Sequence, residues 1–216
     1  MKPLPRLHLV TDDAVLANDD FTGVAEAVLD RCRGIAALHV RGPATGGARL
    51  HAIAARMQAA ALSTGAALFV NDRIDIAMAV RAHGVQLGSR SLSVRDARAL
   101  LGASALIGSS VHGATEAVEA EREGADFVVL GTIFESASHG GRPGAGIALI
   151  RDTAQRAALP IVAIGGITPA RVTEVAGAGA HGVAILGGVW HAADPLAAVD
   201  EYADRVWRAW QQDSRQ

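Results

Sequence analysis

The sequence predicts a single (β/α)8 barrel, in which eight parallel strands alternate with eight helices. Short apolar runs recur along the chain, and each ends in a polar residue or a glycine. Alanine-rich stretches with helical spacing separate these runs, so that strand and helix patterns alternate throughout. The chain has 216 residues, which is close to the length of one such barrel.

The predicted strands are continuous apolar runs, which are typical of a parallel sheet covered on both faces. An open doubly wound sheet is the rival fold, but no GxGxxG fingerprint follows the first run, and the glycine pairs cluster late in the chain. In chain order, strands are expected at Leu7–Thr11, Ala36–Arg41, Ala67–Asn71, Gly84–Gly88, Ala105–Ser109, Asp126–Gly131, Ile161–Gly165 and Gly182–Gly187.

The predicted helices lie between these strands and carry end signals. Thr168 and Asp194 each precede a proline, which places a capping side chain before the first helical residue. Glycines occur where helices should end, at positions 34, 65, 124 and 177. We expect one domain over residues 1–216 with a loose tail from about residue 211. Helices are expected at Val24–Cys32, Arg49–Ser63, Ile74–Ala82, Val94–Leu101, Ala114–Glu123, Ile147–Ala157, Ala170–Ala176 and Pro195–Trp210.

The composition excludes several classes of protein. Half of the residues are hydrophobic and the formal net charge is −2, so nothing indicates a nucleic-acid or membrane partner. The single cysteine, Cys32, fits a reducing compartment, and we expect a cytoplasmic protein. Lys2 is the only lysine, which excludes mechanisms that need a lysine inside the fold.

Polar residues at the ends of the predicted strands are the candidates for substrate binding, because barrel active sites lie there. Arg41 offers a planar fork to a carboxylate or phosphate, and His39 faces the same side of its strand. Each candidate also has a structural alternative, such as an ion pair for Arg41 or a helix cap for Asn71. The candidates are His39, Arg41, Asn71, Gln86, Ser110 and Thr132.

Two glycine pairs predict a phosphate-binding site. Gly165 and Gly166 follow the seventh predicted strand, and Gly187 and Gly188 follow the eighth. Glycines let backbone N–H groups approach an anion closely, and these two loops commonly bind phosphate in barrels. Tight turns without a ligand are the alternative.

Two histidines are candidates for a catalytic acid or base, and the sequence does not choose between them. His112 follows the fifth predicted strand, and His139 lies in the long glycine-rich loop after the sixth. The remaining histidines outside the strand-2 motif are expected to be structural or exposed, namely His8, His51, His83, His181 and His191.

Several motifs together resemble the thiamine phosphate synthase superfamily, which includes the TenI-like thiazole tautomerases. They are LHLVTDD, LHVRGP, FVNDRIDIAMAVRAHGVQLGS, IGSSVHGATEAVEAEREGADFVVLGTIF, PIVAIGGITP and AGAHGVAILGG, which occur in order between about residues 7 and 190. The resemblance implies a (β/α)8 barrel, in agreement with the strand pattern.

Differences from the synthase pattern favour the TenI-like branch. The synthase joins an aminopyrimidine diphosphate to a thiazole phosphate with magnesium, and its strand-2 motif is Gln-x-Arg-x-Lys. Here only Arg41 of that motif is present, and the strand-6 loop has His139 in place of a lysine. Of the two carboxylates expected to hold magnesium, only Asp72 is present. These losses argue against synthase activity, because a diphosphate leaving group needs its charge neutralised.

The resemblance therefore implies an isomerase that aromatises a thiazole carboxylate phosphate tautomer by proton transfer. Its partner would be a phosphorylated thiazole. The glycines would bind the phosphate, Arg41 would bind the carboxylate, and the reaction would need no cofactor or metal. Thr132 stands where the tautomerase pattern has a histidine, so His112 or His139 would move the proton.

Two alternative functions stay open. One is a Mg²⁺-dependent thiamine phosphate synthase in which Arg90 and Arg142 replace the lysines. The other is a non-catalytic protein that binds thiazole phosphate or thiamine phosphate, or regulates in response to them. A homo-oligomer is possible in each case.

Overall fold

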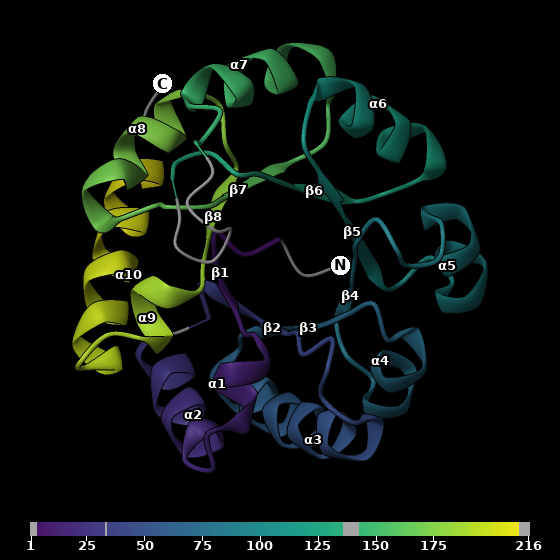
Figure 1. The fold of residues 1–216 in the computed structure, drawn as a ribbon, viewed down its shortest axis with the longest axis vertical. Coiled ribbons are helices and arrows are strands. Elements are labelled where there is room, and N and C mark those ends of the chain that lie inside the picture. Colours follow the sequence, from purple (N-terminus) through teal and green to yellow (C-terminus); the bar gives the residue numbers. More distant parts are fainter. Residues whose placement is uncertain (1–3, 33, 136–142, 212–216) are drawn as a thin grey trace.

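The computed structural model describes residues 4–32, 34–135 and 143–211, and within them eight parallel strands close into one barrel (Figure 1). Each strand pairs with the next in the chain, and β1 pairs with β8. The predicted (β/α)8 barrel is confirmed. The strands are β1 (Leu7–Val10), β2 (Ala36–Val40), β3 (Ala67–Asn71), β4 (Gly84–Leu87), β5 (Leu106–Val111), β6 (Phe127–Leu130), β7 (Ile161–Ile164) and β8 (Gly182–Ile185).

Helices surround the barrel as an outer ring (Figure 1). They are α1 (Asp13–Ala17), α2 (Phe21–Cys32), α3 (Gly47–Thr64), α4 (Ile74–Val80), α5 (Val94–Leu101), α6 (Ala114–Glu123), α7 (Ile147–Arg156), the 3-10 turn η2 (Pro169–Arg171), α8 (Val172–Gly177), α9 (Gly187–Trp190) and α10 (Pro195–Gln211). Among the described residues, no helix combines the length and apolar character needed to cross a membrane.

The strands separate two hydrophobic clusters, because alternate side chains point to opposite faces of the sheet. On β2, for example, Leu38 belongs to the large cluster between the sheet and the helices, and Ala37 belongs to a smaller one. The smaller cluster fills the barrel and contains Val10, Ala37, Ala67, Phe69, Leu106, Phe127, Val129, Val162 and Ala184. The barrel is therefore a packed core with its site at one end rather than a pore.

The segment before β1 packs against the last strand and the last helix. Arg6 donates from Nη1 to the carbonyl of His181 at 2.8 Å, and Val183 donates to the carbonyl of Arg6 at 2.8 Å. The Arg6 guanidinium also lies 5.4 Å from the ring centre of Trp210 in α10. These contacts join the two ends of the described chain at the amino-terminal end of the barrel.

The helix-end predictions are confirmed in part. Asp194 caps α10, since its Oδ1 accepts hydrogen bonds from Leu196 N and Ala197 N at 2.9 and 3.1 Å. Thr168 makes no capping hydrogen bond from its side chain, so that prediction is wrong. Gly177 was expected at the position that ends the helix, but it is the last helical residue of α8, and Ala178 is the C-cap. Gly34, Gly65 and Gly124 adopt positive φ as expected of residues that end helices.

Candidate functional site

Three adjoining cavities cross the carboxyl-terminal end of the barrel, where the sequence places the site. The central cavity measures about 370 Å³, and we call its neighbours the arginine cavity (about 410 Å³) and the glycine cavity (about 470 Å³). The arginine cavity shares Arg41, Asn71, Ser110 and His112 with the central one. The glycine cavity shares Ile164, Ala184 and Leu186 with it.

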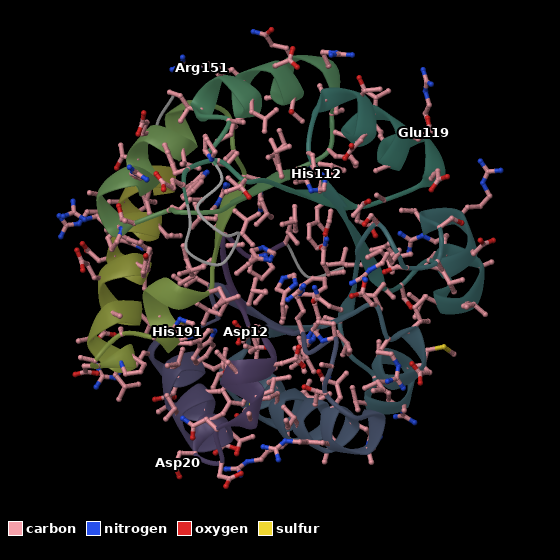
Figure 2. The ribbon with its side chains drawn as sticks, viewed as in Figure 1. Asp12, Asp20, His112, Glu119, Arg151 and His191 are labelled. Atoms are coloured by element: carbon pink, nitrogen blue, oxygen red, sulfur yellow. The ribbon has the colours of Figure 1, made fainter. Side chains whose placement is uncertain are left out.

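The central cavity gathers all six residues that the sequence proposes for substrate binding. They come from five different strand ends and are His39, Arg41, Asn71, Gln86, Ser110 and Thr132. His112 and Asp12 also line this cavity. Both lie inside the ring of helices in Figure 2, whereas Asp20, Glu119 and Arg151 lie at its outer edge. The structure thus brings the candidates together, and their role in binding stays a prediction.

Thr11 fixes the position of Arg41 at the cavity. The Thr11 hydroxyl donates to the Arg41 carbonyl at 2.9 Å and accepts from the Arg41 N–H at 2.8 Å. Thr11 is fully buried, so these hydrogen bonds are shielded from water. They join the ends of β1 and β2 and hold the backbone from which the guanidinium projects.

Two residues that line the central cavity each have a buried amide oxygen with no hydrogen-bond partner among the described residues. Gln86 donates from Nε2 to Ser110 Oγ at 3.0 Å, which leaves Gln86 Oε1. Neither this oxygen nor Asn71 Oδ1 has a hydrogen-bond partner among the described residues. Leaving a buried acceptor unsatisfied costs about 1–3 kcal/mol. A ligand that brought an N–H or O–H donor to either oxygen would remove this cost.

The arginine cavity is lined by three arginines and one aspartate, and the guanidinium of Arg73 is paired with Asp75 at 2.6 and 2.9 Å. Arg41, Arg73 and Arg90 line it together with Asp72. Asp72 adopts φ 63°, and its Oδ1 accepts hydrogen bonds from the Ser91 hydroxyl and from Gly88 N. Arg73 was not predicted as a site residue, although it lies two residues after Asn71 at the same strand end.

Residues on both sides of the first turn of α3 line the same cavity. Thr45 and Leu50 line the cavity, and Gly46 at the N-cap of this 18-residue helix offers no side-chain hydrogen bond. The N–H groups of a first helical turn have no partner within the helix and attract negative charge. Together with the arginines, this makes the cavity suited to an anion.

The glycine cavity contains all four glycines predicted to bind phosphate. Gly165, Gly166, Gly187 and Gly188 line it, with Gly165 and Gly166 at φ 102° and 59°. A Cβ at Gly166 would overlap the carbonyl of Glu135, so that position excludes larger residues. The site stays a prediction, now with a defined cavity around it.

The glycine cavity is also lined by two side chains that were not predicted as site residues. They offer positive charge or hydrogen-bond donors. Arg171 donates from Nη1 to the Gly166 carbonyl at 2.9 Å, and its guanidinium lies 4.1 Å from the ring centre of Phe134. His191, which the sequence assigned to a structural or surface role, also lines the cavity. Glu135 also lines this cavity, with its backbone carbonyl against Gly166. Binding residues were predicted only at or directly after the end of a strand. Arg171 and His191 do not lie at such positions, so they were not predicted.

The two candidate acid/base histidines differ in how far the structure describes them. The side chain of His112 is 71% exposed, and its Nδ1 lies 3.3 Å from Glu116 Oε2 on α6. It stands at the border of the central and arginine cavities. His139 lies outside the described residues, so its place relative to the cavities stays a prediction.

Beneath the central cavity, His8 and His39 form a buried pair. His8 Nδ1 lies 2.7 Å from His39 Nε2, and His8 Nε2 lies 2.9 Å from the carbonyl oxygen of Pro5. Burial lowers the pKa of His8 to about 4, although the hydrogen bond to Pro5 opposes this change. Burial, followed by the neighbouring His8, holds the pKa of His39 well below its ordinary value. Both rings are therefore neutral at neutral pH.

Comparison with known proteins gives a consistent result. Residues 7–189 match the TMP-TENI family, described as thiamine monophosphate synthase. A thiamine-phosphate synthase of Salinispora arenicola is 36% identical over 208 residues, which are 95% of this chain and 99% of the relative. One of Methanoculleus marisnigri is 37% identical and covers 93% and 94%. The solved structure of thiamine phosphate pyrophosphorylase from Pyrococcus furiosus has a TM-score of 0.84 and 29% identity, with 95% and 96% covered.

These relatives overturn the prediction of a thiazole tautomerase. Proteins that match almost the whole chain are named synthases, so the assignment to an isomerase is wrong, as is the argument against synthase activity. The physical reason lies in the arginine cavity. The missing lysines were treated as missing positive charge, whereas three arginines line this cavity beside Asp72, and among the described residues only one of them, Arg73, is paired with another carboxylate, that of Asp75. Membership of the superfamily is confirmed, but these relatives do not support its TenI-like branch specifically.

Proposed function

Because the chain belongs to the TMP-TENI family of thiamine monophosphate synthases, we propose that it joins an aminopyrimidine diphosphate to a thiazole phosphate and releases diphosphate. One observation carries this proposal. The central cavity lies between two others, and each of these has the character of an anion site. Two substrates that each carry a phosphate group, with their rings between the two phosphate sites, need such an arrangement.

We assign the diphosphate to the arginine cavity. A guanidinium forms paired, charge-assisted hydrogen bonds to phosphate oxygens and keeps its charge at any physiological pH. Arg41, Arg73 and Arg90 come from three strand ends, so they can surround a diphosphate from several sides. As the bond to the pyrimidine methylene group breaks, the departing diphosphate gains negative charge, and fixed positive groups lower the energy of that transition state.

The residues beside the diphosphate also fit a magnesium ion, which the synthase reaction uses. Mg²⁺ is commonly held by one or two carboxylates together with substrate phosphates, and Asp72 supplies one carboxylate at this cavity. The described residues contain no group of three or more metal-ligating side chains. Phosphate oxygens of the substrate and water would supply the other ligands. When bound, the ion would add positive charge at the leaving group.

We assign the thiazole phosphate to the glycine cavity and the two rings to the central one. The four glycines and Arg171 would contact the phosphate, which leaves the thiazole ring directed toward Ile164 and Leu186 at the shared border. The amino group of the pyrimidine would donate to the unpaired oxygens of Asn71 and Gln86. His112, at the border of the arginine cavity, is assigned a contact with the diphosphate and no proton transfer.

A direct assay tests the proposal. Purified protein is incubated with the aminopyrimidine diphosphate, the thiazole phosphate and Mg²⁺, and thiamine phosphate and diphosphate are measured over time. The proposal predicts equal amounts of both products, and no product when either substrate or Mg²⁺ is omitted. Saturable binding of both substrates without any product would show a non-catalytic binding protein and overturn the proposal.

A further inference from the structure

The carbonyl groups of residues 164–167, at the end of β7 and in the loop after it, all accept hydrogen bonds. Two of them accept from backbone N–H groups in the loop after β6, and the third accepts from Arg171. The fourth, that of Ile167, accepts from the hydroxyl of Tyr202 in α10 at 2.9 Å. Among the described residues, none accepts a hydrogen bond from the N–H group of Gly166 or Ile167. The loop therefore has its acceptors occupied and keeps donors for an anion in the glycine cavity.

Tyr202 contacts both glycine loops of this cavity. Its hydroxyl holds the loop after β7 at Ile167. The same hydroxyl lies against Gly188 in the loop after β8, where an added Cβ would overlap the hydroxyl oxygen. Helix α10 packs against α8 and α9, the helices into which these two loops lead (Figure 1). One buried hydroxyl thus joins loops that follow two different strands.

The Tyr202 hydroxyl has no hydrogen-bond donor left for a phosphate. A phenol carries one proton, and Tyr202 donates it to the Ile167 carbonyl. Tyr202 is 3% exposed, and burial, followed by the charge of Glu201, raises its pKa to about 12. The hydroxyl therefore stays protonated at neutral pH and keeps this hydrogen bond. Since a phosphate dianion only accepts hydrogen bonds, any effect of the hydroxyl on phosphate binding passes through the loops.

We propose that Tyr202 is a positioning residue, which holds the loops after β7 and β8 together so that their N–H groups converge on one phosphate. The proposal rests on the assignment of the thiazole phosphate to the glycine cavity. Donors that are already in place need no ordering when the phosphate binds, which favours affinity. Without the hydroxyl, the Ile167 carbonyl would lose its donor and could turn toward the anion, which it would repel.

A matched pair of variants tests this role. Tyr202→Phe removes one oxygen atom and keeps the ring. Trp210→Phe is the control, because Trp210 also lies in α10 and donates to a backbone carbonyl, that of Ala180 at 3.2 Å, but at the amino-terminal end of the barrel. Thermal unfolding of both variants confirms that they are folded at the temperature of the measurement.

Isothermal titration calorimetry with the thiazole phosphate gives the decisive comparison. Its dissociation constant is expected to rise about tenfold in Tyr202→Phe, the effect of roughly one hydrogen bond, and to stay unchanged in Trp210→Phe. KM for the aminopyrimidine diphosphate is expected to stay unchanged in both variants. Equal rises in the two dissociation constants would show a general loosening of α10 and would overturn the proposal.

The same titration separates this proposal from the function on which it rests. If the wild-type protein does not bind the thiazole phosphate, both the proposed function and the role of Tyr202 are refuted. If the wild type binds it and Tyr202→Phe binds it equally well, only the role of Tyr202 is refuted.

The contact with Gly188 provides an independent test. Gly188→Ala places a methyl group against the Tyr202 hydroxyl and is expected to weaken binding of the thiazole phosphate. In Tyr202→Phe the overlapping oxygen is absent, so the same substitution should raise the dissociation constant by a smaller factor. Equal factors in the two backgrounds would contradict a joining of the loops through Tyr202.

Tyr202 is the only tyrosine in the chain, so the wild-type side chain can be observed directly. Protein that contains ¹³Cζ-labelled tyrosine gives one nuclear magnetic resonance signal from this residue. The signal is expected to shift when the thiazole phosphate binds and to stay in place with the aminopyrimidine diphosphate alone. If Tyr202→Phe does not fold, this measurement still decides the question, because an unshifted signal at saturating thiazole phosphate would overturn the proposal.

Discussion

Arg41, Arg73 and Arg90 belong to three different strand ends and border one cavity beside Asp72. If these arginines bind the diphosphate, the loss of one guanidinium group weakens the binding of the aminopyrimidine diphosphate and leaves the binding of the thiazole phosphate unchanged. Arg90→Gln is expected to raise KM for the aminopyrimidine diphosphate about 10- to 100-fold, because a hydrogen bond to a charged group contributes roughly 1.5–3 kcal/mol. The control is Arg95→Gln, on the exposed side of α5. Similar kinetics in both variants would show that Arg90 does not contact the diphosphate.

The buried histidine pair makes stability depend on pH. The unfolded chain protonates a histidine near pH 6.5, whereas folded His8 stays neutral down to a pKa of about 4. The unfolded state therefore binds more protons between these values, so stability is complete above pH 6.5 and declines as the pH falls toward 4. His39 and His181, whose pKa values are also lowered, act in the same direction.

Denaturant unfolding measured between about pH 6 and pH 5 tests this dependence. Each neutral buried histidine contributes a slope of at most about 1.4 kcal/mol per pH unit. His8→Gln removes one of these groups and should reduce the slope by close to that amount. An unchanged slope would show that His8 is already protonated in the folded protein.

The residues of the site could be predicted from the sequence to the extent that they follow strands. Alternation along β2 places His39 and Arg41 on the same face as the interior residue Ala37. The pairing of His39 with His8 was not predictable, because it depends on the register of β1 against β2, in which Val10 lies opposite His39. His8 was therefore assigned a structural role with no partner.

At the scale of the elements, the caps of η2 and α10 differ although both precede a proline. Asp194→Ala removes an oxygen that accepts from two backbone N–H groups, so it should lower the free energy of unfolding by about 1 kcal/mol. Thr168→Ala removes no capping bond and should change it by less than about 0.5 kcal/mol. Thermal unfolding of both variants measures the difference. Equal losses would contradict the assigned caps.

The long elements were predictable and the short ones were not. Apolar runs and helical spacing locate every strand and all the helices of seven residues or more. Helices α1 and α9 have five and four residues, too few for helical periodicity to show. Both matter to the site. Asp13 in α1 accepts from Ala44 N and Thr45 Oγ1 in the loop beside the arginine cavity, and Trp190 in α9 donates to the Val10 carbonyl.

At the scale of the whole molecule, closure of the barrel depends on strands that approach each other closely. A Cβ at Gly84 in β4 would overlap the carbonyl oxygen of Leu106 in β5, and backbone cannot move aside as a side chain can. Gly84→Ala is therefore expected to destabilise the protein by roughly 1–3 kcal/mol or more. The control is Gly23→Ala in α2, where a Cβ meets nothing within 4 Å and should stabilise by about 0.5–1 kcal/mol.

Denaturant titration distinguishes these two glycine variants, and a loss of stability in both would contradict the role given to strand contact.

The arrangement of the whole barrel also explains why the sequence predicted the wrong reaction. The absence of each lysine can be read from the sequence at a single position. The convergence of three arginines on one cavity cannot, because it depends on the closed barrel.

Arg6 contacts His181, Val183 and Trp210, so the two ends of the described chain lie close together. The ring of strands can therefore be cut at another loop without changing which strands are neighbours. A circular permutant that links residue 211 to residue 4 and opens at Gly102, where a Cβ would meet nothing within 4 Å, keeps every strand beside its present neighbours. Such a molecule should bind both substrates as the natural chain does. In this permutant His8 would lie in the middle of the chain and keep its hydrogen bond to the Pro5 carbonyl.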